Sequence, residues 1–336
     1  MVKIKNLLLI IPMLFLFFLS TSCSKVNQKN MDYNPIKISL DTFQGYAYIF
    51  IAKEKGIFKK NGVDVDIVLN QDYQVSQKNF ANGLVDGVFS VFADAISASQ
   101  QGVPLKVVCV RDQSIKADVI MAKPEITSVE DLKGKKIGVE GINSFSHLFV
   151  LSILQKYGLS EGDVFFANIP SQQLTDSIEK GEVVAGHTYS TGVTHAKEKG
   201  YHPLAYAGEV QGIITDVLAF HPTIVKNRPE DIKKIVKSLF EALEFQETHK
   251  EEASQIIAKA IGDTPQSVGE GLDGLRNFNL KESAEAMRPS EELTSLFGSG
   301  KLISEFFLNR GQISVAPDLN EIVDSHFVEQ LFKEQK

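Results

Sequence analysis

Hydroxyl and histidine side chains near predicted helix and strand ends are the groups of this chain best suited to chemistry. Ser144, Ser146 and His147 lie where a helix is predicted to begin. Free backbone N–H groups and hydroxyls at such a place could hold an anionic head group. The alternative is ordinary N-capping by Ser144 or Ser146. His187 and Tyr189 end a predicted strand, and we expect them to face one cleft together with the residues at this helix start.

An enzyme would use His147 or His187 as a general base, with a nucleophile or carboxylate within hydrogen-bond reach. Turnover that is lost in His187→Ala would support this reading. The sequence contains no P-loop, GxGxxG, HExxH, GxSxG or paired CxxC motif. The seven histidines are scattered without metal-ligand spacing, so we expect neither a metal site nor a cofactor.

The first positioning unit covers residues 37–69 and reads as strand, loop, helix, turn and strand. Apolar residues predict a strand over 38–43, a helix from 46 to 58 and a second strand over 63–69. Parallel strands joined by a helix collect ligands at the carboxyl end of the strand. This places a binding lip at residues 42–46, with Gln44, Gly45 and Tyr46 as candidates. The alternative is a plain connecting turn at Gln44 and Gly45.

The same rule gives a second lip further along the chain. A strand over 86–92 ends in Ser90, Val91 and Phe92, and Asp94 starts the following helix. Residues 111–123 are mixed and extended, which suits a crossing between domains. A second α/β series follows over 135–207, with Ser128 and Asp131 as a capping box before it.

Residues 213–220 are predicted to return the chain to the first domain, after which the pattern becomes helical. Pro229 sits at a helix start, and further helices are predicted over 251–261, 283–297 and 301–309. Two α/β series of about 100 residues each indicate two lobes.

The N-terminal segment is predicted to direct export. Residues 1–22 have a positive start, an apolar run and small residues before Cys23, as a signal peptide does. The segment resembles a bacterial lipoprotein signal, with Leu19 one place earlier than in the commonest pattern. Cys23 is then the acylated (palmitate-type) first residue, and 23–35 a polar tether. Plain cleavage and secretion is the alternative.

Charge and cysteine content exclude several classes of protein. The formal net charge of −7 argues against a nucleic-acid partner. It does not forbid an anionic ligand, because helix N-termini can bind an anion locally. Only two cysteines are present. With Cys23 acylated, Cys109 has no disulfide partner and is expected to be a buried core thiol.

Four segments in order, 45–65, 81–99, 112–122 and 128–150, carry a resemblance over most of residues 36–335. The chain is similar to the solute-binding proteins of nitrate, sulfonate and taurine ABC importers, which include thiamine-precursor binders. The resemblance implies an α/β, two-lobed, type II periplasmic-binding-protein fold with mixed, mostly parallel sheets and a helical C-terminal extension. Lobe 1 is then 36–118 plus 217–336, and lobe 2 is 119–216.

The resemblance also implies which residues grip the ligand between the lobes. They are Gln44, Gly45, Tyr46, Ser90, Val91, Phe92, Gln113, Ser144, Ser146, His147, His187, Tyr189 and Asp216. Relatives often carry tryptophans in the first lip and near position 189, but this chain has none and reads Tyr189-Ser190-Thr191. Fungal pyrimidine-synthesising enzymes of this fold use a cysteine-rich motif that Cys109 alone cannot supply.

The function implied is capture of a small solute for delivery to an ABC permease and its ATPase. The protein would be a monomer without enzymatic activity, anchored in the cell envelope on the outer face of the cytoplasmic membrane or in the periplasm. A sensor that passes ligand occupancy to a membrane partner is the rival. An oxyanion such as a sulfonate or nitrate favours Ser144, Ser146 and His147, whereas a flat pyrimidine-like heterocycle favours Tyr46, Phe92 and Tyr189.

Overall fold

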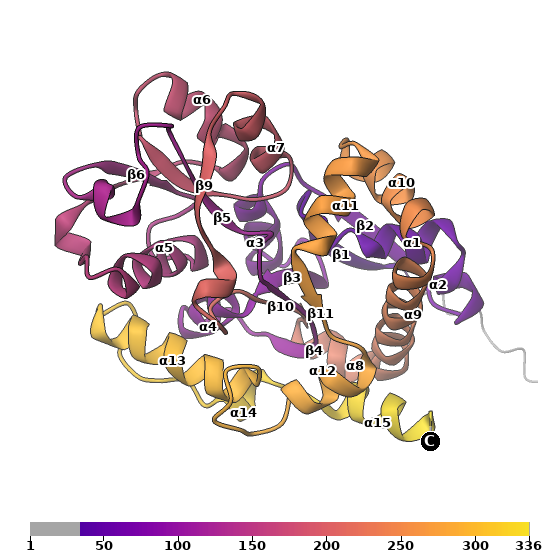
Figure 1. Ribbon diagram of the computed structural model, residues 1–336. Helices are drawn as coiled ribbons and strands as arrows, with labels where there is room; N and C mark the ends of the chain where they lie inside the picture. Colours follow the sequence, from indigo (N-terminus) through magenta and orange to yellow (C-terminus); the bar gives the residue numbers. More distant parts are fainter. Residues whose placement is uncertain (1–33, 336) are drawn as a thin grey trace, which may run out of the picture. The chain divides into compact units, whose positions relative to one another are not determined.

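The computed structural model describes residues 34–335. The predicted signal segment and Cys23 lie outside these residues. Pro35–Lys336 form one unit by their internal contacts. It contains two β-sheets, each flanked by helices (Figure 1). Within the described part of the chain, no helix is both long and apolar enough to cross a bilayer.

The first sheet has the strand order β11-β4-β10-β3-β1-β2. Strands β1 to β4 run parallel, whereas β10 is antiparallel to β3 and β4, and β11 to β4. The strands are β1 (Ile36–Leu40), β2 (Val65–Leu69), β3 (Gly87–Val91), β4 (Lys106–Ser114), β10 (Thr215–Phe220) and β11 (Leu275–Asn277). Cys109 is buried in β4 as a free thiol, as predicted.

The second sheet has the order β7-β6-β8-β5-β9, with β6 parallel to both of its neighbours and β5 antiparallel to both of its own. Its strands are β5 (Val119–Ala122), β6 (Lys136–Val139), β7 (Phe165–Asn168), β8 (Ala185–Thr188) and β9 (His202–Tyr206). The chain crosses between the sheets over residues 115–118 and returns over 207–214. The predicted capping box is confirmed, because the Asp131 carboxylate accepts the Ser128 N–H at 2.9 Å.

Helices cover both sheets. Those that precede the return are α1 (Tyr48–Glu54), α2 (Ile57–Lys60), α3 (Tyr73–Ala81), α4 (Phe92–Gln100), α5 (Phe145–Lys156), α6 (Leu174–Glu179) and α7 (Thr191–Glu198). The later ones are α8 (Pro222–Asn227), α9 (Pro229–Thr248), α10 (Lys250–Ile261), α11 (Pro265–Asp273), α12 (Leu280–Ala286), α13 (Leu296–Asn309), α14 (Leu319–Ile322) and α15 (His326–Glu334). Helix α13 packs against α4 of the first sheet (Figure 1).

Two helix predictions were wrong in their extent. The helix expected from 46 to 58 is divided into α1 and α2 by Gly56, whose φ of 67° is the left-handed conformation that ends a helix. The helix expected over 283–297 stops at Ala286, and the next one begins only at Leu296. Pro289 lies between them, and a proline inside a helix removes a backbone donor and clashes with the preceding turn.

Candidate functional site

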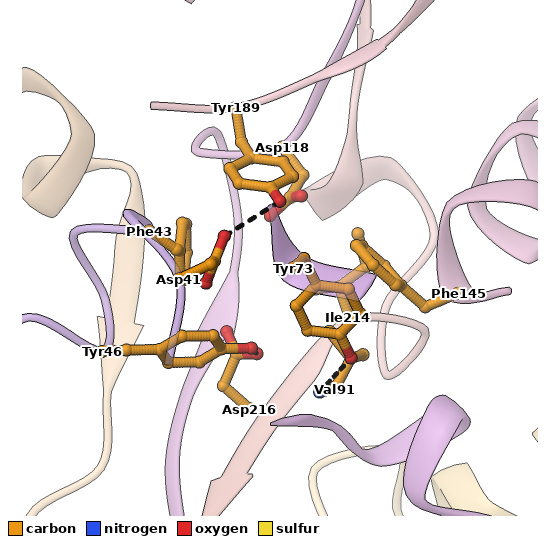
Figure 2. A pocket seen from close by; sticks show the side chains of 10 residues that line it. All are labelled: Asp41, Phe43, Tyr46, Tyr73, Val91, Asp118, Phe145, Tyr189, Ile214 and Asp216. Carbon is orange, nitrogen blue, oxygen red and sulfur yellow. Dashed lines mark hydrogen bonds between the residues drawn. The ribbon is translucent and has the colours of Figure 1, made fainter. Parts of the chain in front are cut away.

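A buried cavity lies where the lips of the two sheets meet (Figure 2). On the side of the first sheet, the cavity is lined by residues that follow β1, by a residue of α3, by the last residue of β3 and by residues at the start of β10. On the side of the second sheet, it is lined by the residue before β5, the first residue of α5 and the residue after β8. The lining residues are Asp41, Phe43, Tyr46, Tyr73, Val91, Asp118, Phe145, Tyr189, Ile214 and Asp216. Its volume is about 10 Å³, close to the room one water molecule needs.

The Tyr189 phenol joins carboxyl groups from both sheets. Its hydroxyl oxygen lies 3.1 Å from Asp41 Oδ2 and 3.0 Å from Glu140 Oε1. A phenol carries one proton, so it donates to one carboxylate and accepts from the other carboxyl, which must be protonated. Burial raises the pKa of Asp41 to about 7, against the opposing effect of the Tyr189 bond. Burial, with repulsion from Asp41, raises the pKa of Glu140 well above its usual range.

A second buried carboxyl group lies on the opposite wall. The Tyr46 hydroxyl donates to Asp216 Oδ1 at 2.6 Å, while Asp216 Oδ2 receives no N–H or hydroxyl donor from residues 34–335 and can share a proton with the neighbouring Asp112 carboxyl. Burial, and then repulsion from Asp112 on β4, raise the pKa of Asp216 well above its usual range. Asp216 pairs with Val91 in the β10–β3 ladder, which brings the carboxyl to the end of β3.

His187 holds the third carboxyl group of the cavity. His187 Nε2 lies 2.8 Å from Asp118 Oδ1, and His187 Nδ1 lies 2.9 Å from Ser146 Oγ. Ser146 Oγ in turn accepts the backbone N–H of Glu140 at 2.9 Å. Both His187 and Ser146 are fully buried. Only Asp118 of this chain of hydrogen bonds lines the cavity, so the chain orients a carboxylate toward it.

Aromatic rings form the walls between these acids. Phe43 meets Tyr46 edge to face with ring centroids 5.0 Å apart, and it meets Tyr189 at 5.6 Å. Tyr73 and Phe145 make a similar pair at 5.2 Å on the other side. The Tyr73 hydroxyl accepts the N–H of Val91 at 3.1 Å, which fixes the ring (Figure 2). The site therefore combines ring faces with carboxylate oxygens.

Polar contacts also join the two lips directly. The Ser190 hydroxyl donates to Gln44 Oε1, and Gln172 Nε2 donates to Thr42 Oγ1 at 3.2 Å. Ser190 has a φ of 51°, a left-handed conformation that is uncommon outside glycine. This strain lies next to Tyr189, at the turn that carries the phenol into the cavity.

Four of the thirteen residues expected at the site line the cavity: Tyr46, Val91, Tyr189 and Asp216. Gly45, Ser90 and His187 contact residues of that wall, namely Phe43, Tyr73 and Asp118, whereas the Gln44 side chain lies against Gly271 and Ser190. Gln113 donates to Thr215 Oγ1 at 3.1 Å and to the Leu293 carbonyl, away from the cavity. Phe92 is fully buried at the start of α4, where it packs near Gly300 of α13.

The N-terminus of α5 already has internal partners, which explains why Ser144, Ser146 and His147 do not line the cavity. The N–H of Phe145 donates to Asp94 Oδ1 at 2.8 Å. His147 Nδ1 accepts the Asn143 N–H at 3.1 Å, and the Ser144 hydroxyl donates to the Gly141 carbonyl. Burial and the nearby Arg310 lower the pKa of His147 to about 4, so the ring is neutral. A carboxylate of this chain thus occupies the place considered for an anion.

Sequence reasoning found Asp216 but missed the other acids. Asp41 follows β1 directly and Glu140 follows β6 directly, so a strand-end rule that included the first residue after each strand would have found both. Asp118 lies in the crossing between sheets, and Tyr73 and Phe145 begin helices. These three carry no spacing signal. Among residues 34–335 no group of three or more His, Cys, Asp or Glu is arranged to hold a metal ion.

Residues 44–253, more than half of the chain, match the family described as NMT1/THI5 like. This chain belongs to that family. Over 253 residues, 70% of this chain and 74% of the relative, it is 23% identical to the taurine-binding periplasmic protein of Escherichia coli. It is also 31% identical over 153 residues to a putative thiamine biosynthesis protein of Haemophilus influenzae, covering 45% of this chain and about half (48%) of that one.

An enzyme is also among the relatives. The 4-amino-5-hydroxymethyl-2-methylpyrimidine phosphate synthase of Aspergillus parasiticus is 26% identical over 143 residues, 42% of this chain and 41% of the enzyme. In structure, the chain resembles the ligand-binding component of an ABC-type import system from Staphylococcus aureus, with a TM-score of 0.74, 11% identity and coverage of 88% and 98%. The predicted family and the predicted periplasmic-binding-protein fold are both confirmed.

Proposed function

We propose that this protein is the solute-binding component of an ABC importer. The observation that carries the proposal is the buried cavity between two α/β sheets, built from the strand ends and closed by Tyr189. Family membership and the likeness to an ABC import component support it. The proposed lobes are 36–118 plus 217–336 and 119–216, and the permease and ATPase subunits are the proposed partners.

The size of the cavity supports capture by lobe closure. A volume of about 10 Å³ admits no organic solute, so a ligand enters only when the lips move apart. Contacts such as Gln172–Thr42 and Tyr189–Asp41 must part to admit it. Closure is driven by the higher affinity of the closed form for the solute. Of the expected residues, Tyr46, Val91, Tyr189 and Asp216 are the proposed ligand contacts.

Export and anchoring complete the proposal. Residues 1–22 would be removed as a lipoprotein signal, Cys23 acylated and residues 23–35 used as a tether in the cell envelope. A monomer suffices, because both lobes come from one chain. The solute classes considered are a sulfonate, a nitrate-like anion and a pyrimidine-like heterocycle.

Chemical crosslinking in membranes of the source cells tests this function without knowledge of the solute. After purification, the full chain with its native N-terminal segment should be found crosslinked to a polytopic permease and an ATP-binding-cassette subunit. A Cys23→Ser variant should be lost from the membrane fraction and lose these partners. A membrane-bound chain that crosslinks only to a kinase or cyclase would contradict import and favour sensing.

The hydrogen bonds of His187 are the observation that would favour an enzyme, since Asp118 and Ser146 lie on its two ring nitrogens. Ser146, however, is fully buried and does not line the cavity, so it meets no substrate. We expect His187→Gln to weaken solute binding roughly 10-fold by releasing Asp118, with no turnover in either protein. Calorimetry with product analysis checks both points, and turnover lost in the variant would establish the enzyme.

A further inference from the structure

The cavity is lined by acids without a base. Asp41, Asp118 and Asp216 contribute three carboxyl groups among its ten lining residues, none of which is Lys, Arg or His. Glu140 adds a fourth carboxyl group behind the Tyr189 hydroxyl. Buried charges of one sign are costly unless a partner of opposite sign or a proton neutralises them.

Two carboxyl oxygens in this wall receive no N–H or hydroxyl donor from residues 34–335, and Asp216 can share a proton there only with another acid, Asp112. They are Asp41 Oδ1 and Asp216 Oδ2, and both residues are 1% exposed. Figure 2 shows the two carboxyl groups turned toward the space between Tyr46, Tyr73 and Tyr189. Once ionised, a buried carboxylate oxygen without a partner is expensive, so a ligand that supplies N–H donors as these groups lose their protons gains more than it would at a satisfied wall.

The nearby bases are directed elsewhere. The Arg111 guanidinium lies 3.9 Å over the Tyr48 ring and donates to Asn277 Oδ1 at 3.1 Å. His187 already contacts Asp118 and Ser146 through its two ring nitrogens. Neither side chain lines the cavity, so neither is placed to meet an anionic ligand.

We propose that the solute is a small planar organic cation whose N–H groups bind the free oxygens of Asp41 and Asp216. The aromatic side chains Phe43, Tyr46, Tyr73 and Tyr189 would cover its faces, and rings favour a cation through their negative faces. This inference rests on the proposed solute-binding function. It disfavours sulfonates and nitrate, which would find no basic partner in the lining.

Proton exchange gives the inference a distinctive signature. In the free protein Asp41 and Asp216 hold protons near neutral pH, since burial raises the pKa of each. The groups that face them are Glu140, Asp118, Asp112, Tyr46, Tyr73 and Tyr189, with Arg111 beyond Asp112. A cation replaces these protons, so its affinity should rise about 10-fold per pH unit for each proton released. An anion or a neutral acceptor would bind more tightly as the pH falls.

Fractionated small molecules from the source cells test the proposal. The full chain in detergent is unfolded and refolded to remove bound solutes, and its thermal unfolding is then measured with three fractions of the extract. We expect the fraction retained on a cation exchanger at pH 6 to raise Tm by several degrees. The anion-exchange fraction and the neutral flow-through should not raise it. The effect should be larger at pH 8 than at pH 6.

Matched variants make the result specific. Asp216→Asn should reduce the Tm shift given by the cationic fraction, by an amount that corresponds to an apparent affinity at least 5-fold lower. Asp66→Asn, the same change at an exposed residue of β2, should leave the Tm shift unchanged. Stabilisation by the anionic or neutral fraction alone would overturn the inference and leave solute binding standing. A chain that no fraction stabilises and that crosslinks to no permease would overturn the proposed function as well.

Discussion

The Tyr189 phenol is the residue-scale feature that links the two lips. Its one hydroxyl faces both Asp41, beside the first sheet, and Glu140, beside the second. Since the hydroxyl has a single proton, one of these two carboxyl groups must be protonated in this arrangement, although both would be ionised at neutral pH if they were isolated in water. Closure of the lips, protonation of these carboxyl groups and the charge of the ligand are therefore coupled through the Tyr189 hydroxyl.

Stability should follow the protonation of Asp41. Its pKa is about 7 in the folded chain, against an ordinary value of 3.8. Between these values the folded state binds more protons than the unfolded state, so Asp41 lowers stability as the pH rises from about 4 to 7. We expect Asp41→Asn to be more stable than the parent by about 2 kcal/mol at pH 8, with little gain at pH 4. Urea unfolding at both pH values measures this. Asp66→Asn is the control, and an equal gain at both pH values would contradict the assignment.

The strand-end rule worked at the scale of elements and failed at the scale of side chains. It placed Tyr46, Val91 and Tyr189 at the lips because β1, β3 and β8 end there. It passed over Asp41 and Glu140, the residues directly after β1 and β6, because a single acid after a strand has the same pattern as a turn residue. The α5 N-terminus was misleading for a related reason. Its partner Asp94 is distant in sequence, and only the fold brings the two together.

The two segments that cross between the sheets would have to bend in the proposed lobe motion. They touch where the Gly208 N–H donates to the Ile115 carbonyl at 2.8 Å. A Cβ at position 208 would lie 2.8 Å from that same oxygen, too close for an unstrained contact. We expect Gly208→Ala to cost about 1–3 kcal/mol of stability by forcing the segments apart. Gly162→Ala is the control, because its added Cβ would meet only Ser160 Oγ at 3.9 Å. Chemical unfolding compares the two, and equal costs would contradict the role of this contact.

Arg310, directly after α13, provides a contact between the two proposed lobes. It forms a bidentate pair with Glu161, one arm being Nη2 to Oε1 at 2.9 Å, and it reaches Asn143 Oδ1 at 3.4 Å. Arg310→Ala should favour the open form and weaken solute binding about 2- to 5-fold, since a partly exposed ion pair contributes up to about 1 kcal/mol.

Salt should reduce this difference between Arg310→Ala and the parent, because the pair is partly exposed to solvent. Calorimetric titration with the stabilising fraction at 0.05 and 0.5 M NaCl measures it. Lys301→Ala is the matched control, since its ion pair with Glu291 lies within the proposed first lobe. Equal losses in the two variants would show that the Arg310 pair has no special part in closure.

At the scale of the whole molecule, two lobes are held together over a cavity with almost no free volume. The two-lobed fold was predictable from the family resemblance and from the two α/β series. The order of the units in each series follows from the apolar periodicity of the sequence and from the glycines that end helices. The degree of closure was not predictable. It depends on contacts such as Tyr189–Asp41 and Gln172–Thr42, between residues more than a hundred positions apart.

The solute-free protein should therefore close and open with pH. Closing buries Asp41 and Glu140 around the Tyr189 phenol and raises the pKa of both carboxyl groups, Asp41 to about 7. The closed form thus holds more protons than the open form, in which the same groups meet water. Closure is favoured at pH 5 and is lost as the pH rises through about 7.

Small-angle scattering of the refolded full chain should accordingly give a smaller radius of gyration at pH 5 than at pH 8. Asp41→Asn, which cannot ionise, should remain compact at both pH values, whereas Asp66→Asn should open at pH 8 as the parent does. A parent protein with the same radius at both pH values, or a larger one at pH 5, would contradict the coupling. Addition of the cationic fraction at pH 8 should restore the compact form, because the solute charge then replaces the missing protons.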